Sequence, residues 1–148
     1  MARKPDTGPW TITIPRPVRW LTANDRGRWE IATRTKAWRD AAFVAAFRVK
    51  PPKGLDLVRV DALFQFAASP PVRELENLRP TLKAAVDGAI GPRRRTAAGY
   101  GIVPDDSDRH VLYGYYAHET TGHTRVHPPS QCCCGALVLT VSEVRHDP

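Results

Sequence analysis

The chain is short of cysteine, of acidic residues and of long apolar runs. Its three cysteines are adjacent, at 132–134, and a disulfide framework needs spaced pairs, so the pattern favours a reducing cytoplasm. The longest apolar stretch, "AAFVAAF" at 41–47, is far shorter than the roughly 20 residues that span a bilayer. The basic N-terminus is followed by no apolar run. Export and membrane anchoring are therefore not expected.

The charge balance indicates the kind of partner. The chain has 22 Lys and Arg residues against 15 Asp and Glu residues, for a net charge of +7. A basic surface attracts phosphates and releases their counterions on binding. No basic amphipathic helix is evident, so nucleic acid is favoured over an acidic membrane.

The length of 148 residues predicts a single domain over 1–148. Hydrophobic periodicity, prolines and glycines mark the elements. The expected elements are a strand at 10–14, a helix at 31–50, a strand at 57–66, a helix at 78–90 that Asn77 caps, and strands near 110–117 and 136–144. This order predicts an α+β fold, with two helices on a mainly antiparallel mixed sheet.

The apolar sides of these elements can be predicted as well. In the first helix, Trp38, Ala42, Ala45 and either Phe47 or Ala46 should face the core. The strand at 57–66 alternates between apolar and polar residues, which is typical of a half-buried strand. In the second helix, the expected apolar side consists of Leu78, Leu82, Ala85, Val86 and Ala89.

Acidic residues gather in two stretches, "VRELENLRPTLKAAVDG" at 72–88 and "VPDDSDRH" at 103–110. Six of the fifteen lie there: Glu74, Glu76, Asp87, Asp105, Asp106 and Asp108. If Glu74 and Glu76 lie in extended backbone, their side chains share one side of the chain. Like charges held this close repel, and Mg²⁺, which prefers oxygen ligands, would offset that cost.

A simpler interpretation stays open for both stretches. Glu74 and Glu76 are then solvated loop acids, and Lys83 and Asp87 are an ion pair on an exposed helix. The "PDDSD" segment is then an Asp-rich turn whose side chains bond nearby backbone groups.

Over most of its length the chain resembles the RusA-type Holliday-junction resolvases, a phage-associated family of Mg²⁺-dependent endonucleases. The resemblance rests on the opening strand with its proline- and arginine-bearing loop, the acid-x-acid-Asn motif ending at Asn77, the helix "LKAAVDG" and the later Asp pair. It implies a RusA-like fold and cleavage of four-way DNA junctions in recombination and repair. It also implies a phage or prophage gene expressed in the bacterial cytoplasm.

The resemblance also implies roles for particular residues. Glu74, Glu76 and Asp106 would bind Mg²⁺, for which Mn²⁺ can substitute, and Lys83 would assist electrostatically. Asn77, Asp87 and Asp105 would be accessory residues.

Two departures from the family pattern leave alternatives open. Both family aspartates are glutamates here, and Lys83 lies six residues after Asn77, whereas many relatives have the lysine three residues after the asparagine. The alternatives are a catalytically weakened branched-DNA-binding relative and a nuclease with a broader preference for flaps or other branches. We expect a homodimer, because a four-way junction is close to two-fold symmetric and each chain supplies one site.

Other residues are candidates for contacts with DNA. The arginines expected to contact phosphates are Arg16, Arg19, Arg26, Arg28, Arg79, Arg93, Arg94 and Arg95, and the alternative for "GPRRRTAAG" is a solvated loop. Trp20, Trp29 and Tyr100 either stack on bases or complete the edge of a core. His123, His127 and the adjacent cysteines could be zinc ligands, but their spacing favours a thiol-rich strand start.

Overall fold

The computed structural model describes residues 8–68, 70, 74–93, 99–105, 107–122 and 134–145. In chain order its elements are β1 (Trp10–Pro15), α1 (Arg28–Val49), β2 (Val58–Phe66), the 3₁₀ helix η1 (Leu75–Leu78), α2 (Arg79–Ala89), β3 (Val111–Thr120) and β4 (Gly135–Glu143). Every strand and helix expected from the sequence has a counterpart. The differences at the ends are of one to three residues, and η1 is an addition.

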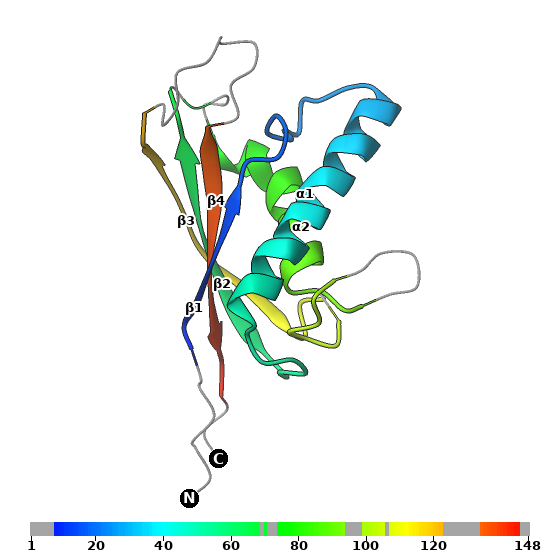
Figure 1. The fold of residues 1–148 in the computed structure, drawn as a ribbon, viewed down its shortest axis with the longest axis vertical. Helices are drawn as coiled ribbons and strands as arrows, with labels where there is room; N and C mark the ends of the chain where they lie inside the picture. Colours follow the sequence, from blue (N-terminus) through cyan, green and yellow to red (C-terminus); the bar gives the residue numbers. More distant parts are fainter. Residues whose placement is uncertain are drawn as a thin grey trace, which may run out of the picture.

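The described strands form one sheet in the order β1-β4-β2-β3. Strand β4 is antiparallel to β1 and to β2, whereas β3 is parallel to β2. The parallel pair follows from the crossover through α2, which returns the chain to the end of the sheet where β2 begins. Both helices lie on the same side of the sheet (Figure 1). The expected α+β class, a mixed sheet with two helices packed against it, is confirmed.

The core lies between the sheet and the helices. Along β2, burial alternates with the sequence, so that Val58, Val60, Ala62, Phe64 and Phe66 are buried and the residues between them are partly exposed. Each large apolar side chain that is fully buried contributes about 1.5–3 kcal/mol. Because successive side chains of a strand point to opposite faces, the partly exposed residues of β2, such as Arg59 and Asp61, lie on the open face of the sheet, away from the helices.

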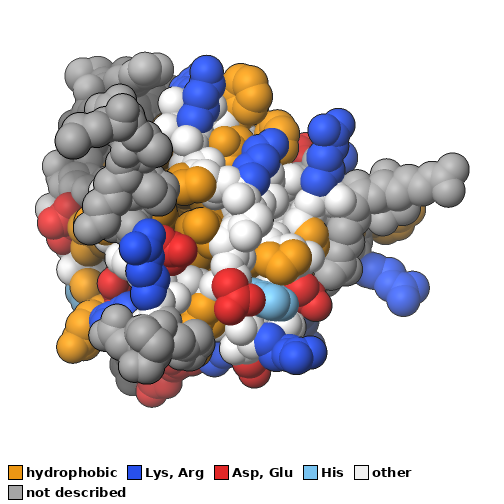
Figure 2. All heavy atoms as spheres, turned by 90° about the horizontal axis from the view of Figure 1, so that it is seen from below, with side chains coloured by type: hydrophobic (Ala, Val, Ile, Leu, Met, Phe, Trp, Pro, Cys, Tyr) orange, Lys and Arg blue, Asp and Glu red, His pale blue; other side chains and the backbone are white. Residues whose placement is uncertain are grey.

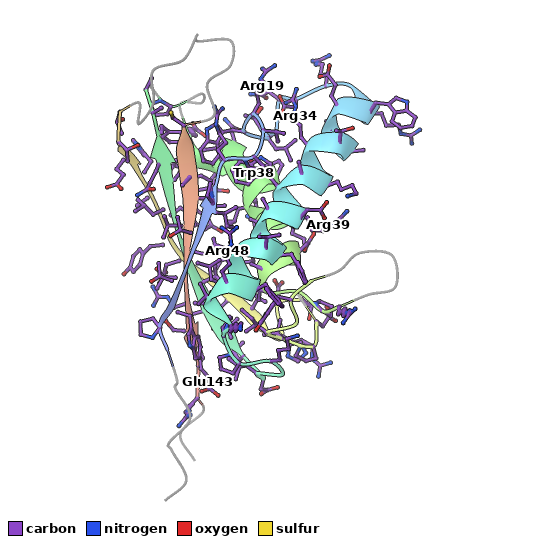
Figure 3. The ribbon with its side chains drawn as sticks, in the orientation of Figure 1. Arg19, Arg34, Trp38, Arg39, Arg48 and Glu143 are labelled. Carbon is purple, nitrogen blue, oxygen red and sulfur yellow. The ribbon has the colours of Figure 1, made fainter. Side chains whose placement is uncertain are left out.

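Helix α1 contacts the core through Trp38 and small residues. Trp38 is fully buried, its Nε1 donates to the carbonyl oxygen of Arg19 at 3.2 Å, and it points from the helix toward the sheet (Figure 3). Of the two alternatives for the apolar face, Ala46 is buried, whereas Phe47 is 57% exposed. Nine residues at about 100° each place Phe47 on the side of the helix opposite Trp38.

Helix α2 packs closely against α1. A Cβ atom at Gly88 would clash with the backbone carbonyl of Arg39 in α1, so only glycine allows this approach. The expected apolar side of α2 is buried throughout. The expected Asn77 cap is wrong, because Asn77 lies in η1 and α2 begins after Leu78 without a capping side-chain hydrogen bond.

Strand β3 is an edge strand with one irregularity. Its pairing with β2 shifts between Val60 and Ala62, which pair with Tyr113 and Tyr116. A Cβ atom at Gly114 in this bulge would collide with the side chains of Asp61 and Arg59. Asp61 also accepts a hydrogen bond from the backbone N–H of Tyr115 at 2.7 Å. The bulge is therefore stabilised from β2 on the open face of the sheet.

Across the described ranges, neither α1 nor α2 combines the length and the apolarity that crossing a bilayer requires.

Candidate functional site

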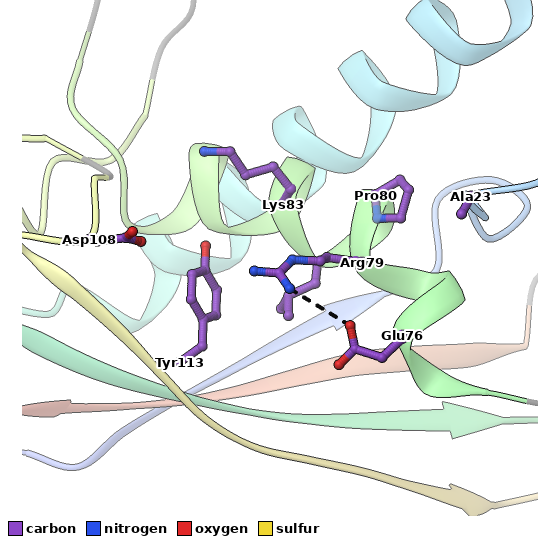
Figure 4. A pocket seen from close by; sticks show the side chains of 8 residues that line it. Ala23, Glu76, Arg79, Pro80, Lys83, Asp108 and Tyr113 are labelled. Atoms are coloured by element: carbon purple, nitrogen blue, oxygen red, sulfur yellow. Dashed lines mark ion pairs between the residues drawn. The ribbon is translucent and has the colours of Figure 1, made fainter.

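A pocket of about 570 Å³ lies between α2 and β3 (Figure 4). The segment between β1 and α1 closes one side of it with Ala23. The lining residues are Ala23, Glu76, Arg79, Pro80, Leu82, Lys83, Asp108 and Tyr113. Three candidates from the sequence, Glu76, Arg79 and Lys83, thus contribute to one surface.

The helical repeat explains the positions of the two basic residues. Arg79 and Lys83 are four residues apart on α2, so they lie one above the other on the same side of the helix. On the opposite side of α2, the buried residues are Thr81, Ala85 and Gly88. Burial of that side directs Arg79 and Lys83 toward the pocket.

Glu76 lines the pocket from η1, and Glu74 does not line it. The condition that both residues lie in extended backbone is not met: Glu74 is extended, with φ −115° and ψ 131°, but Glu76 lies in η1. Residues two apart in a 3₁₀ helix point in different directions, at three residues per turn. Glu76 Oε2 lies 3.7 Å from the guanidinium of Arg79, and both side chains are more than half exposed. This exposed pair contributes little to stability.

Lys83 has an acidic partner on its own helix. Its Nζ donates to Asp87 Oδ1 at 2.8 Å, an i,i+4 ion pair. Asp87 is not part of the pocket lining. This pair is the one that the simpler interpretation of the sequence expects, and it holds the ammonium group of Lys83 beside the pocket.

The second acidic stretch contributes Asp108. Asp108 lies in the turn before β3. The backbone carbonyl oxygen of Ser107 closes this turn by accepting hydrogen bonds from the backbone N–H groups of His110 and Val111. Asp105 accepts from the backbone N–H of Ser107 at 3.2 Å, as expected for an Asp-rich turn. Asp106, the expected third metal ligand, lies outside the described residues.

Two tyrosines of β3 complete the surroundings of Arg79. The guanidinium carbon of Arg79 lies 6.0 Å from the centre of the Tyr113 ring, at the outer limit of a cation–π contact. Burial raises the pKa of the Tyr116 phenol, the positive charge of Arg79 lowers it, and the negative charge of Glu76 raises it. Tyr116 therefore stays neutral at physiological pH.

The pocket separates its two carboxylates. Glu76 and Asp108 lie toward opposite ends, with Arg79, Lys83 and Tyr113 between them (Figure 4). Within the ranges that the structure describes, no three His, Cys, Asp or Glu side chains come together as metal ligands. The zinc alternative involves His123, His127, Cys132 and Cys133, which lie outside these ranges, while Cys134 is buried beside the start of β4.

Most of the candidate arginines lie apart from the pocket. Among the candidate arginines that the structure describes, Arg79 lines it. Arg19, Arg26, Arg28 and Arg93 are exposed, Arg16 is partly buried, and Arg94 and Arg95 lie outside the described residues. At the end of the molecule seen in Figure 2, the described Lys and Arg side chains are spread out, with Asp and Glu side chains among them. That end does not present a single basic patch.

Sequence reasoning assigned no role to Asp108, Tyr113 or Ala23. Asp108 belongs to an acidic stretch that the sequence marked, so its charge was a usable signal. Tyr113 and Ala23 carry no such signal, because their place at the pocket depends on the pairing of β3 with β2 and on the hydrogen bond from Ala23 N to the Asn77 carbonyl oxygen, at 2.8 Å. Comparison of the chain with protein-family profiles and with curated proteins gives no match.

Proposed function

We propose that the chain is a Mg²⁺-dependent endonuclease that cuts branched DNA, with the four-way junction as its substrate. The observation that carries the proposal is that Glu76, Arg79 and Lys83 line one pocket together with Asp108. These residues come from both acidic stretches, which the resemblance to RusA-type resolvases marks as the site. The net charge of +7 supports DNA as the partner.

The charges of the pocket support the need for a metal ion. Its lining has two cations, Arg79 and Lys83, and two carboxylates, Glu76 and Asp108, so these charges sum to zero. A phosphodiester entering this pocket adds a negative charge that the lining does not balance. A bound divalent cation would supply the missing positive charge.

The donor set of the described residues suits Mg²⁺. This ion is usually held by one or two carboxylates together with water and substrate phosphates, rather than by a full protein cage. Glu76 offers an exposed carboxylate in the pocket, and Glu74 offers another two residues earlier. We propose that these two residues and Asp106 hold the ion, with Mn²⁺ as a substitute. Bound Mg²⁺ would orient water and neutralise charge that develops on the phosphodiester.

The basic residues of α2 position the DNA backbone. Arg79 can present two parallel N–H donors to a phosphate, and its ion pair with Glu76, at 3.7 Å, is weak enough to exchange. Lys83 adds a point charge whose position the Asp87 carboxylate restrains. Both residues would contribute to binding of the substrate before cleavage, through contacts with its phosphates. Lys83 would also balance charge on the oxygen that leaves.

The test is nicking of a synthetic four-way junction with Mg²⁺. We expect Glu76→Gln to lower the nicking rate by more than about 100-fold. Loss of a residue that only hydrogen-bonds to a metal ligand lowers metal affinity or activity about 10–100-fold, and loss of a ligand itself should cost more. Binding should be retained, since the basic residues remain. The matched control is Glu119→Gln, because Glu119 pairs with Gln65 of β2 on the open face of the sheet. Comparable loss in both variants, or full nicking by Glu76→Gln, would contradict the assignment.

A second candidate is a branched-DNA-binding protein that does not cut. Two observations support this candidate: Glu74 lies outside the pocket lining, and glutamates replace both family aspartates. Tight junction binding by the wild-type chain without nicking, in Mg²⁺ and in Mn²⁺, would establish it. Nicking of flaps as fast as of four-way junctions would indicate the broader nuclease.

A further inference from the structure

The first turns of α1 project from the rest of the protein. All eight residues from Arg26 to Thr33 are exposed, and α1 begins well away from the sheet (Figure 1). Trp29 lies in this stretch with 86% of its surface exposed. Burial of a tryptophan is strongly favourable, so this ring is available to a partner outside the chain.

The other two aromatic candidates from the sequence belong to the core. Trp20 is 9% exposed and packs against Trp38, with ring centres 5.0 Å apart. Tyr100 is 7% exposed, and its hydroxyl donates to the carbonyl oxygen of Pro51 at 3.1 Å. Trp29 is the one of the three whose ring faces solvent.

Trp29 stands on a fixed support. Asp25 Oδ2 accepts hydrogen bonds from the backbone N–H of Thr22 at 2.9 Å and from Arg34 at 3.2 Å. Arg34 also pairs with Glu30 at 3.2 Å, and Figure 3 shows Arg34 at the end of the molecule where α1 begins. The start of α1 is thereby tied to the segment before it. An aromatic ring on a fixed support loses little conformational entropy when it binds.

The charges around Trp29 favour a polyanion. Arg34 has carboxylate partners in Asp25 and Glu30. Arg26 and Arg28, on either side of Gly27, are exposed, and neither forms an ion pair with another described residue. Along the chain, Trp29 is flanked by Arg26 and Arg28 on one side and by Glu30 and the 37% exposed Ile31 on the other. This setting suits a nucleic acid better than an apolar protein surface.

We propose that Trp29 stacks on an unpaired base of the bound DNA, while Arg26 and Arg28 contact the adjoining phosphates. This inference rests on the proposed action on branched DNA, because a branch point exposes base faces that a continuous duplex hides. Any base can stack on an aromatic ring, so the contact recognises branched or single-stranded structure without recognising sequence. Ala23 lines the pocket six residues before Trp29, so their Cα atoms are at most about 22 Å apart.

The test measures binding by fluorescence anisotropy without divalent metal, with a labelled four-way junction and a labelled thymine oligonucleotide. Trp29→Ala should weaken binding by roughly 5- to 150-fold, the range for loss of one stacked base. Trp29→Phe should keep most of the affinity. The dependence on salt should stay the same in both variants, whereas Arg28→Ala should reduce the log–log slope by about 0.7–0.9.

Phe47→Ala is the matched control. Phe47 is an aromatic residue of the same helix that is 57% exposed, about 27 Å farther along the helix axis. Its loss should leave binding unchanged. Circular dichroism should show that every variant is folded.

The results distinguish failure of the stacking proposal alone from failure of the proposed function. Unchanged affinity of Trp29→Ala would overturn stacking, and the proposed function stands if the wild-type chain still nicks junctions. An equal loss of affinity in Phe47→Ala would also overturn the stacking proposal, because the loss would then not be specific to Trp29. Failure of the wild-type chain to bind either DNA would overturn both proposals.

Discussion

Replacing Thr81 with valine would test how the segment before α1 is attached to α2. Thr81 is fully buried, and its hydroxyl makes two hydrogen bonds to one residue, Leu21. It accepts from the Leu21 backbone N–H at 2.8 Å and donates to the Leu21 carbonyl oxygen at 2.8 Å. Valine has nearly the same shape, but it leaves a donor and an acceptor unpaired in the core.

The expected loss of stability follows from those two groups. A buried group left unsatisfied costs about 1–3 kcal/mol, and two such groups cost about 2–6 kcal/mol. The new methyl group returns about 0.8 kcal/mol, so we expect the free energy of unfolding to fall by about 3 kcal/mol. For a chain of this size, the midpoint of thermal unfolding should fall by about 6–12 °C.

Urea unfolding followed by circular dichroism measures the effect. The control is Thr11→Val, because Thr11 is exposed on β1 and its change should stay within about 0.5 kcal/mol. A loss below about 1 kcal/mol for Thr81→Val, or an equal loss in the control, would refute the reasoning. It would mean that the backbone groups of Leu21 find other partners when the hydroxyl is absent.

Three further predictions rest on the structure, and a fourth rests on the proposed function. Asp108→Asn should strengthen junction binding several-fold in the absence of metal, because it removes a negative charge from the pocket lining; anisotropy would show it. Gly88→Ala should destabilise the protein by about 1–3 kcal/mol in urea, because the added methyl group clashes with the Arg39 carbonyl. The raised pKa of Tyr116 means that above about pH 10 the unfolded chain loses this proton before the folded chain does. Stability should therefore fall as pH rises there, and the fall should be smaller in Tyr116→Phe. The active species should be a dimer, with twice the 16.5 kDa mass of the chain by light scattering. Mixing the wild-type protein with excess Glu76→Gln chains should then yield junctions nicked on one strand. A monomer that makes both cuts would contradict this prediction.

Local periodicity was sufficient to predict most of the fold. The alternation in β2 and the apolar side of α2 follow from repeats of 2 and 3.6 residues, and both are buried as expected. The pairing of β3 with β2 carries no such local signal, since it joins residues more than 50 positions apart, such as Val58 and Val111. The place of Tyr113 and Asp108 beside α2 depends on that pairing.

The conformation of Glu76 shows a second limit of sequence reasoning. An acid-x-acid spacing is compatible with a strand or with a tight helix, and packing decides between them. Leu78 is fully buried, and Leu75 packs against the core from three residues before it. Side chains three apart align in a 3₁₀ helix, so η1 packs both leucines against the core, with Leu78 fully and Leu75 partly buried, and turns Glu76 outward. The sequence shows the two leucines three residues apart, but it does not show the part of the core against which they pack.

The position of β4 has a consequence for how the protein is made. The last strand of the chain lies between β1 and β2, and it pairs Thr11 with Thr140 and Val60 with Val141. The ribosome therefore releases most of the chain before β1 has its strand partner, and such distant pairing slows folding. A stop codon anywhere before residue 135 would leave β1 and one edge of β2 unpaired, and unpaired strand edges lead to aggregation. Truncation would thus yield an aggregation-prone fragment rather than a smaller working domain.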